Sequence, residues 1–219
     1  LNPPTDRDLP VTIRDVRVLS DGRLAEFVIH NRLRFVRGEG GMIATLRRDA
    51  VDCAGPETVC GAYRGAMAAW TGSVQRFAVS ADGRLATLIR ADLAGVGEGS
   101  PEAIALIAAA ERSNPRLLGE AELREALRYV GQDLVANHLA DATGSEQDQV
   151  IVRMGTDNQV IVWSQTVLRI DGQDDTALIR ERCDVVDRAS GLLLDSVIIS
   201  QASGDGGPPI SRRTWVLGR

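Results

Sequence analysis

Apolar and polar positions alternate most clearly in the last third of the chain. Short runs rich in Val, Ile and Leu are separated there by turns rich in Asp, Gly and Ser, which is the pattern of strands joined by tight connections. Because short connections favour antiparallel neighbours, we predict an antiparallel meander of five strands. These strands occupy residues 149–154, 158–170, 176–187, 191–201 and 210–217.

The first half of the chain predicts hairpins and one short helix. Residues 11–19 and 24–36 read as strands around a Ser-Asp-Gly-Arg turn, and residues 42–48 read as a third short strand. Residues 57–70 carry apolar side chains at helical spacing. A second hairpin over residues 79–90 repeats the Asp-Gly-Arg-Leu-Ala sequence of the first, because Asp-Gly is a favoured hairpin turn.

The middle of the chain predicts two helices. Ser100 and Pro101 suit the start of the first, which should end near Arg112. The second covers residues 119–141, and we expect its apolar face to be buried against a sheet. That face carries Leu123, Leu127, Val130, Leu134 and His138.

Together these elements predict the α+β class. We expect antiparallel β-meanders with the long amphipathic helix packed across the sheet, and N-terminal hairpins that join the same sheet or a second small sheet. The Gly-rich stretch 94–100 is the best boundary between two halves. Residues 1–94 would be a hairpin-rich half with one short helix, and residues 95–219 helices followed by the five-stranded meander. One continuous domain is the alternative.

Composition restricts the classes of function. The 30 acidic residues outnumber the 25 basic ones, and a net charge of −5 argues against nucleic acid as the main partner. All of the basic residues are Arg, which excludes mechanisms that need a lysine amine. No apolar run approaches the roughly 20 residues that a membrane-spanning helix needs.

Cysteine placement predicts a disulfide as one of two alternatives. Cys53 and Cys60 flank a Gly55-Pro56 turn that can fold the chain back on itself. A bridge would stabilise the fold by roughly 2–3 kcal/mol and would persist in an oxidising compartment, whereas two free thiols are the other reading. Cys183 lies in an apolar strand and is expected to be an inert core residue.

The chain begins with Leu1 rather than Met, as a secreted protein or a bacterial envelope lipoprotein would after loss of its leader. Together with the candidate bridge, this start favours a periplasmic or otherwise extracytoplasmic location. A cytoplasmic protein whose start is missing is the alternative.

No catalytic, cofactor or metal site is predicted. The loop at residues 95–100 resembles a dinucleotide loop, but its third glycine is misplaced and Glu98 would repel phosphate. A His-rich metal site is excluded because the chain has only 2 histidines, and no G-x-S-x-G motif marks a nucleophile. The acidic turn at residues 171–175 fails as a calcium loop, since Arg182 stands where a bidentate Glu is needed.

One strand face is a candidate binding site. His30, Arg32 and Arg34 share a face of the strand over residues 24–36. Residues 30–48 hold five arginines against a single acid, a local charge of +4 in a net acidic protein. Guanidinium groups suit phosphate or carboxylate, so this face predicts anion binding or partner docking. The more common alternative is a solvated face whose arginines pair with acids elsewhere in the fold.

The sequence therefore predicts a non-enzymatic, extracytoplasmic binding or assembly module that contacts a protein partner or an anionic envelope component. No cofactor is expected, and a membrane contact is expected only through an anchor preceding Leu1. A small hydrolase-type enzyme and an accessory subunit of a larger complex are the alternatives.

Overall fold

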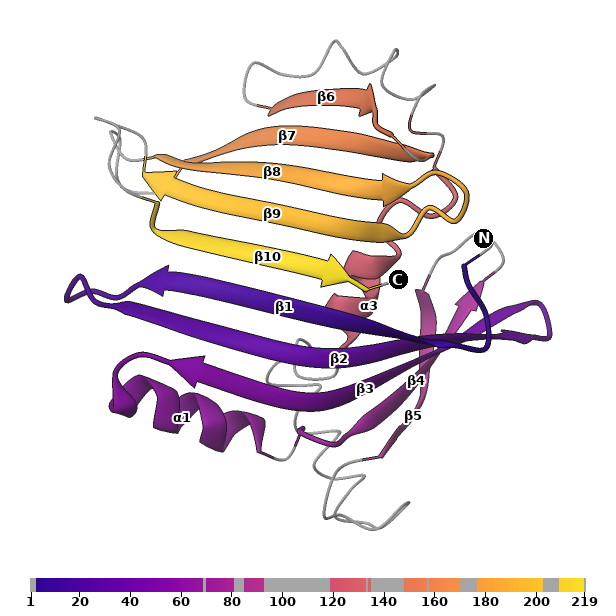
Figure 1. Ribbon diagram of the computed structural model, residues 1–219, viewed down its shortest axis with the longest axis horizontal. Coiled ribbons are helices and arrows are strands. Elements are labelled where there is room, and N and C mark those ends of the chain that lie inside the picture. Colours follow the sequence, from indigo (N-terminus) through magenta and orange to yellow (C-terminus); the bar gives the residue numbers. More distant parts are fainter. Residues whose placement is uncertain are drawn as a thin grey trace.

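The structure is a computed structural model, and the part of the chain that it describes forms one large antiparallel sheet (Figure 1). The helix expected from Ser100 to Arg112 lies outside the described residues, and so does His138. The described residues are 3–68, 70–80, 85–92, 119–132, 134, 148–156, 158–169, 177–202 and 209–218.

Ten strands make up the sheet, in the spatial order β5-β4-β3-β2-β1-β10-β9-β8-β7-β6. Each strand runs antiparallel to its neighbours. The bounds are β1 (Asp8–Val18), β2 (Leu24–Gly38), β3 (Gly41–Ala54), β4 (Val74–Ser80), β5 (Leu85–Asp92), β6 (Asp148–Met154), β7 (Gln159–Arg169), β8 (Ala177–Asp187), β9 (Leu193–Ala202) and β10 (Ser211–Leu217).

The first and last strands of the chain lie side by side in the middle of the sheet. In their register Val11 faces Leu217 and Ile13 faces Trp215. This pairing joins five strands from residues 1–94 to five strands from the rest of the chain, so both halves contribute to one sheet. Figure 1 shows the two sets of strands meeting at β1 and β10.

The hydrophobic core lies on one side of the sheet, which we call the inner face. Alternate residues of β1 and β2 are buried there, because successive strand side chains point to opposite sides of a sheet. Burying each large apolar side chain contributes about 1.5–3 kcal/mol. From the strands, the core includes Leu9, Val11, Ile13, Leu33, Phe35, Met42, Ala44, Leu46, Phe77, Val79, Val160, Val162, Val186, Leu193, Trp215 and Leu217.

Helix α3 (Glu120–Ala126) covers part of the inner face and contacts β5 and β9. Figure 1 shows it behind β10 and β1. Leu123 is fully buried under the sheet and belongs to the core cluster. A second short helix, α1 (Glu57–Met67), follows β3 and packs against it.

The long helix predicted over residues 119–141 is wrong, because α3 ends at Ala126 and the chain continues in turns. Gly131 adopts a φ of 74°, a left-handed conformation that a continuing α-helix does not allow. The expected burial of the apolar face is nevertheless found, since Leu123 is 0% exposed and Val130 is 8% exposed. A short helix followed by turns buries residues that the helical periodicity had assigned to one long helix.

The predicted α+β class is therefore also wrong. The described residues form a single sheet of ten strands with two short helices, α1 and α3, rather than meanders crossed by a long helix. The sequence pattern located individual elements but carried no sign that the first and last strands pair and give both halves of the chain one core.

Individual strands were predicted more accurately than the class. The five strands of the last third begin and end within two residues of their predicted positions. The hairpin joining β1 to β2 turns at Gly22, whose φ of 80° suits a tight Asp-Gly turn. β3 is the exception among the early strands, since it extends to Ala54 instead of ending at residue 48.

Candidate functional site

The predicted site residues lie together on the side of the sheet opposite the core, which we call the outer face. Burial alternates from Asn31 to Phe35 of β2, so Arg32 and Arg34 point away from the buried Leu33 and Phe35, and the strand period places His30 on the same side as the two arginines. The His30 side chain is 44% exposed and that of Arg32 is 48% exposed. The sequence therefore placed these three residues correctly on one solvent-facing side of a strand.

A β-bulge brings an acid to this face. Asn31 pairs with Arg48 of β3, whereas His30 pairs with Ala50, so Asp49 is an extra residue in β3. A bulge of this kind re-aims side chains locally, and here it sets the Asp49 carboxylate among the arginines of β2 and β3.

Arg32 and Arg34 of β2, Arg47 of β3 and Arg76 of β4 form what we call the arginine cluster. Asp49 lies 2.6 Å from Arg32 Nε and 3.0 Å from Arg47 Nε. Arg34 and Arg76 form no ion pair with any residue that the structure describes. Because exposed Asp8 also lies opposite Arg34 in the β1–β2 register, the cluster keeps a surplus of two positive charges.

His30 lies between two polar neighbours on adjacent strands. Its Nε2 is 3.5 Å from Asp52 Oδ2, and its Nδ1 is 3.4 Å from Thr12 Oγ1. Asp49 and Asp52 fall just beyond the segment 30–48, whose sequence charge is +4, and they lower the charge that this face presents. An anion- or partner-binding role for the predicted residues stays a prediction.

An apolar row, which we call the apolar stripe, crosses the outer face on the other half of the sheet. The strand register aligns Val197 of β9, Cys183 of β8, Trp163 of β7 and Ile151 of β6. Ile151 is 46% exposed, and Cys183 is also exposed. The expectation that Cys183 belongs to the core is wrong, because its neighbours Arg182 and Asp184 are the residues of β8 that point to the buried side.

Partial burial, together with the nearby carboxylates of Asp184 and Asp195, raises the pKa of the Cys183 thiol. The thiolate is the nucleophilic form of cysteine, so this shift makes Cys183 a poor nucleophile at neutral pH. The free cysteine therefore gives no support to a thiol-dependent enzyme.

Buried charges on the inner face are paired with one another. Asp184 is 0% exposed and accepts hydrogen bonds from the Tyr129 hydroxyl and from Arg182 Nε, both at 2.5 Å. Arg182 also binds Glu125 of α3. Burial and the Asp184 charge raise the pKa of Tyr129, which keeps its hydroxyl protonated and able to donate.

A second buried pair holds the same helix to the sheet. Arg48 of β3 donates to Glu122 of α3 at 2.9 Å, and both side chains are almost completely buried. The carboxylates of Glu122, Glu125 and Asp184 are therefore engaged in structural hydrogen bonds.

The predicted disulfide is present. Cys53 at the end of β3 is bonded to Cys60 in α1, with a Cα–Cα distance of 5.4 Å. Figure 1 shows α1 lying beside β3, and the bridge joins the end of β3 to the start of this helix. Because such bridges persist in oxidising compartments, this bond indicates an oxidising environment for the protein.

Among the described residues, no group of three or more His, Cys, Asp or Glu side chains could hold a metal ion. Within the same part of the chain, no helix is both long enough and apolar enough to cross a membrane.

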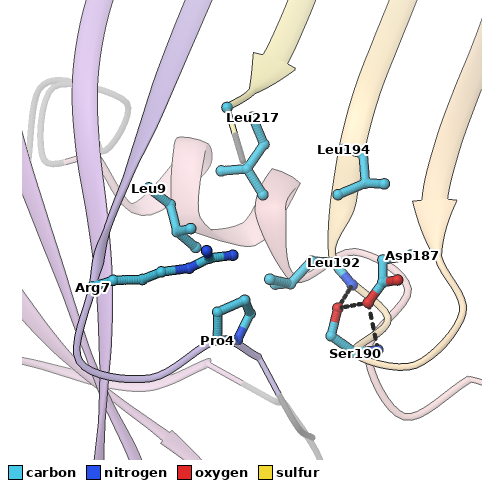
Figure 2. A pocket seen from close by; sticks show the side chains of 9 residues that line it. Pro4, Arg7, Leu9, Asp187, Ser190, Leu192, Leu194 and Leu217 are labelled. Atoms are coloured by element: carbon cyan, nitrogen blue, oxygen red, sulfur yellow. Dashed lines mark hydrogen bonds between the residues drawn. The ribbon is translucent and has the colours of Figure 1, made fainter.

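A pocket of about 220 Å³ opens where the N-terminal segment, the β8–β9 turn and the end of β10 meet (Figure 2). No sequence pattern predicts this site, because its walls come from three segments that are far apart in the chain. Nothing in the local sequence around Arg7 indicates that its side chain lies near leucines from the end of the chain, such as Leu217. The lining residues are Pro4, Arg7, Leu9, Asp187, Ser190, Leu192, Leu194, Leu217 and Gly218.

Comparison with known proteins gives little beyond this geometry. No family model matches the chain, and no curated protein matches it. Among solved structures the chain is similar to one of lipovitellin, titled for its lipid–protein interactions, with a TM-score of 0.43 and 11% sequence identity. The match covers 97% of this chain and 25% of that chain, so this chain spans about a quarter of its neighbour's length. A likeness this weak carries no inference about function.

Proposed function

We propose that this chain is a non-enzymatic module of an extracytoplasmic, periplasm-like compartment that binds a phosphate-bearing component of the cell envelope. The observation that carries the proposal is the arginine cluster, in which four arginines of three neighbouring strands lie on the outer face and, among the described residues, only Arg32 and Arg47 are paired with an acid, Asp49. The Cys53–Cys60 bridge supports the location, because such bonds persist outside reducing compartments.

The chemistry of the cluster fits phosphate. Guanidinium groups donate paired hydrogen bonds to phosphate oxygens, and they stay charged at every physiological pH. Arg34 and Arg76 have no ion pair with described residues, so a ligand does not have to displace an acid to reach them. Each basic residue close to an anionic membrane surface contributes about 1 kcal/mol of binding.

Co-sedimentation with vesicles tests this proposal. Phosphatidylglycerol-containing vesicles should bind the protein at low salt and release it at high salt, whereas phosphatidylcholine vesicles should not bind it. The variant Arg34→Ser/Arg76→Ser should lose about 2 kcal/mol of binding, roughly 30-fold in affinity. The matched control is Arg23→Ser/Arg188→Ser, which removes the same charge from two exposed turns and should bind as the wild type does.

The outcomes separate the sources of phosphate. Binding of soluble polyphosphate as tightly as vesicles would indicate a phosphate polymer rather than a lipid surface, with the arginine cluster still responsible. Loss of vesicle binding in Trp163→Ser but not in the cluster variant would move the contact to the apolar stripe and refute the role of the arginines. Equal losses in the cluster variant and the turn control would also refute it.

A further inference from the structure

The pocket of Figure 2 shares no residue with the arginine cluster, and its base is made of core residues. Leu9 at the start of β1, Leu217 at the end of β10 and Leu192 of the β8–β9 turn form its apolar base. All three are buried members of the hydrophobic core. Because core packing fixes their positions, this base is rigid and exists before any ligand arrives.

A single cation faces this apolar base. Figure 2 shows the Arg7 side chain reaching across the pocket, with its guanidinium group between Leu9 and Leu192 and above Pro4. Arg7 forms no hydrogen bond or ion pair with any part of the chain that the structure describes. The guanidinium group of this exposed arginine lies over apolar surface without a carboxylate partner in the described chain, so its five N–H groups are available to a ligand.

The acid on the opposite wall is engaged in its own turn. Oδ2 of Asp187 accepts hydrogen bonds from Ser190 Oγ at 2.5 Å and from the Ser190 backbone N–H at 2.9 Å. Figure 2 shows these bonds at the edge of the pocket, away from the Arg7 guanidinium. Asp187 therefore stabilises the β8–β9 turn, and it does not neutralise Arg7 by an ion pair.

We propose that this pocket binds a short aliphatic carboxylate. Its carboxylate would accept paired hydrogen bonds from Arg7, and its hydrocarbon tail would lie on Leu9, Leu192 and Leu217. The volume of about 220 Å³ lies below the range of drug-sized ligand pockets, so the pocket suits a small ligand. Hexanoate has this size, and the end of a longer acyl chain would fit in the same way.

Titration of the full chain with hexanoate, followed by NMR of leucine methyl groups, tests the proposal. Leu9, Leu192, Leu194 and Leu217 should shift in one saturable transition. Hexan-1-ol has the same tail without the charge and should bind at least tenfold more weakly. The loss of a charge-assisted hydrogen bond in Arg7→Gln should weaken hexanoate binding roughly 10- to 100-fold.

Two further variants keep the test specific. Arg188→Gln removes the same charge from the β8–β9 turn at a residue that does not line the pocket, and hexanoate should bind it as it binds the wild type. Leu194→Phe fills the pocket without changing charge and should abolish binding of hexanoate and hexan-1-ol alike. Far-UV circular dichroism of each variant confirms that the sheet is intact.

The remaining outcomes overturn the assignment. Equal affinity for hexanoate and hexan-1-ol would refute the role of Arg7, and no methyl shift with either ligand would refute the site. Tighter binding of leucine than of hexanoate would show that Asp187 recruits an amino group, so that the pocket takes a zwitterion instead of a simple carboxylate. Vesicle binding by Arg7→Gln should equal that of the wild type, which keeps this test independent of the arginine cluster.

Discussion

Removal of the Cys53–Cys60 bridge should lower the free energy of unfolding by about 2.5 kcal/mol. The two cysteines are separated by 7 positions, so the bond closes a loop of about eight residues. On the chain-entropy model a loop of that length removes about 8 cal/mol/K from the unfolded state, which gives the stated free energy at room temperature. The variant that tests this value is Cys53→Ala/Cys60→Ala.

Urea denaturation followed by tryptophan fluorescence measures the effect. We expect the oxidised wild type to be the most stable form, and the reduced wild type to match the double variant closely. A reductant should leave the double variant unchanged. Cys183→Ala is the matched control, since Cys183 is exposed and unbridged, and its loss should cost little.

Two results would refute this reasoning. A loss below about 1 kcal/mol on reduction would mean that the unfolded chain already holds these residues close together, so that the bond constrains little. A stability difference of several kcal/mol between the reduced wild type and the double variant would mean that packing around Cys60, which is 1% exposed, dominates instead.

Two further substitutions test the packing of the inner face. Tyr129→Phe removes a buried donor to Asp184 and should cost about 1.5–3 kcal/mol in urea denaturation. The pKa of Tyr129 is raised in the folded state, so the wild type should lose stability above about pH 10, where an unfolded tyrosine ionises. Tyr129→Phe should lose less stability over the same pH range, and equal losses in the two proteins would contradict this reasoning. Gly191→Ala should cost about 1 kcal/mol or more, since Gly191 has a φ of 73° and its new Cβ would lie 2.8 Å from Val130 Cα. Gly65→Ala in α1 meets nothing within 4 Å and should instead stabilise the protein in the same urea denaturation, by up to about 1 kcal/mol.

Local features of the fold could be predicted from the sequence because their causes are local. The strands follow from alternation over a few residues, and the turns follow from Asp-Gly pairs such as the one ending at Gly22. The Cys53–Cys60 bridge also depends on a short segment, in which a Gly-Pro pair reverses the chain. The face of β2 that carries His30 and Arg32 is likewise set by strand periodicity alone.

Features that depend on distant pairings could not be predicted in this way. Arg48 meets Glu122 across 74 positions of sequence, and Tyr129 meets Asp184 across 55. Reading a strand by residue type assigns charged side chains to solvent and apolar ones to the core. It could therefore predict neither that these charged pairs are buried on the inner face nor that Cys183 is exposed. Charge counting over a window fails for the same reason, because the bulge at Asp49 supplies an acid that the window excluded.

The pairing of β1 with β10 determines more than the sheet order. It brings Leu9 and Leu217 to one end of the core, where Arg7 and the β8–β9 turn complete the pocket. The pocket therefore exists only when both ends of the chain are folded together, whereas the arginine cluster needs only the neighbouring strands β2, β3 and β4. A ligand that binds the folded pocket and not the unfolded chain stabilises the fold by mass action. Binding in this pocket is thus linked to the contact that joins the two halves of the sheet, while binding at the arginine cluster is not.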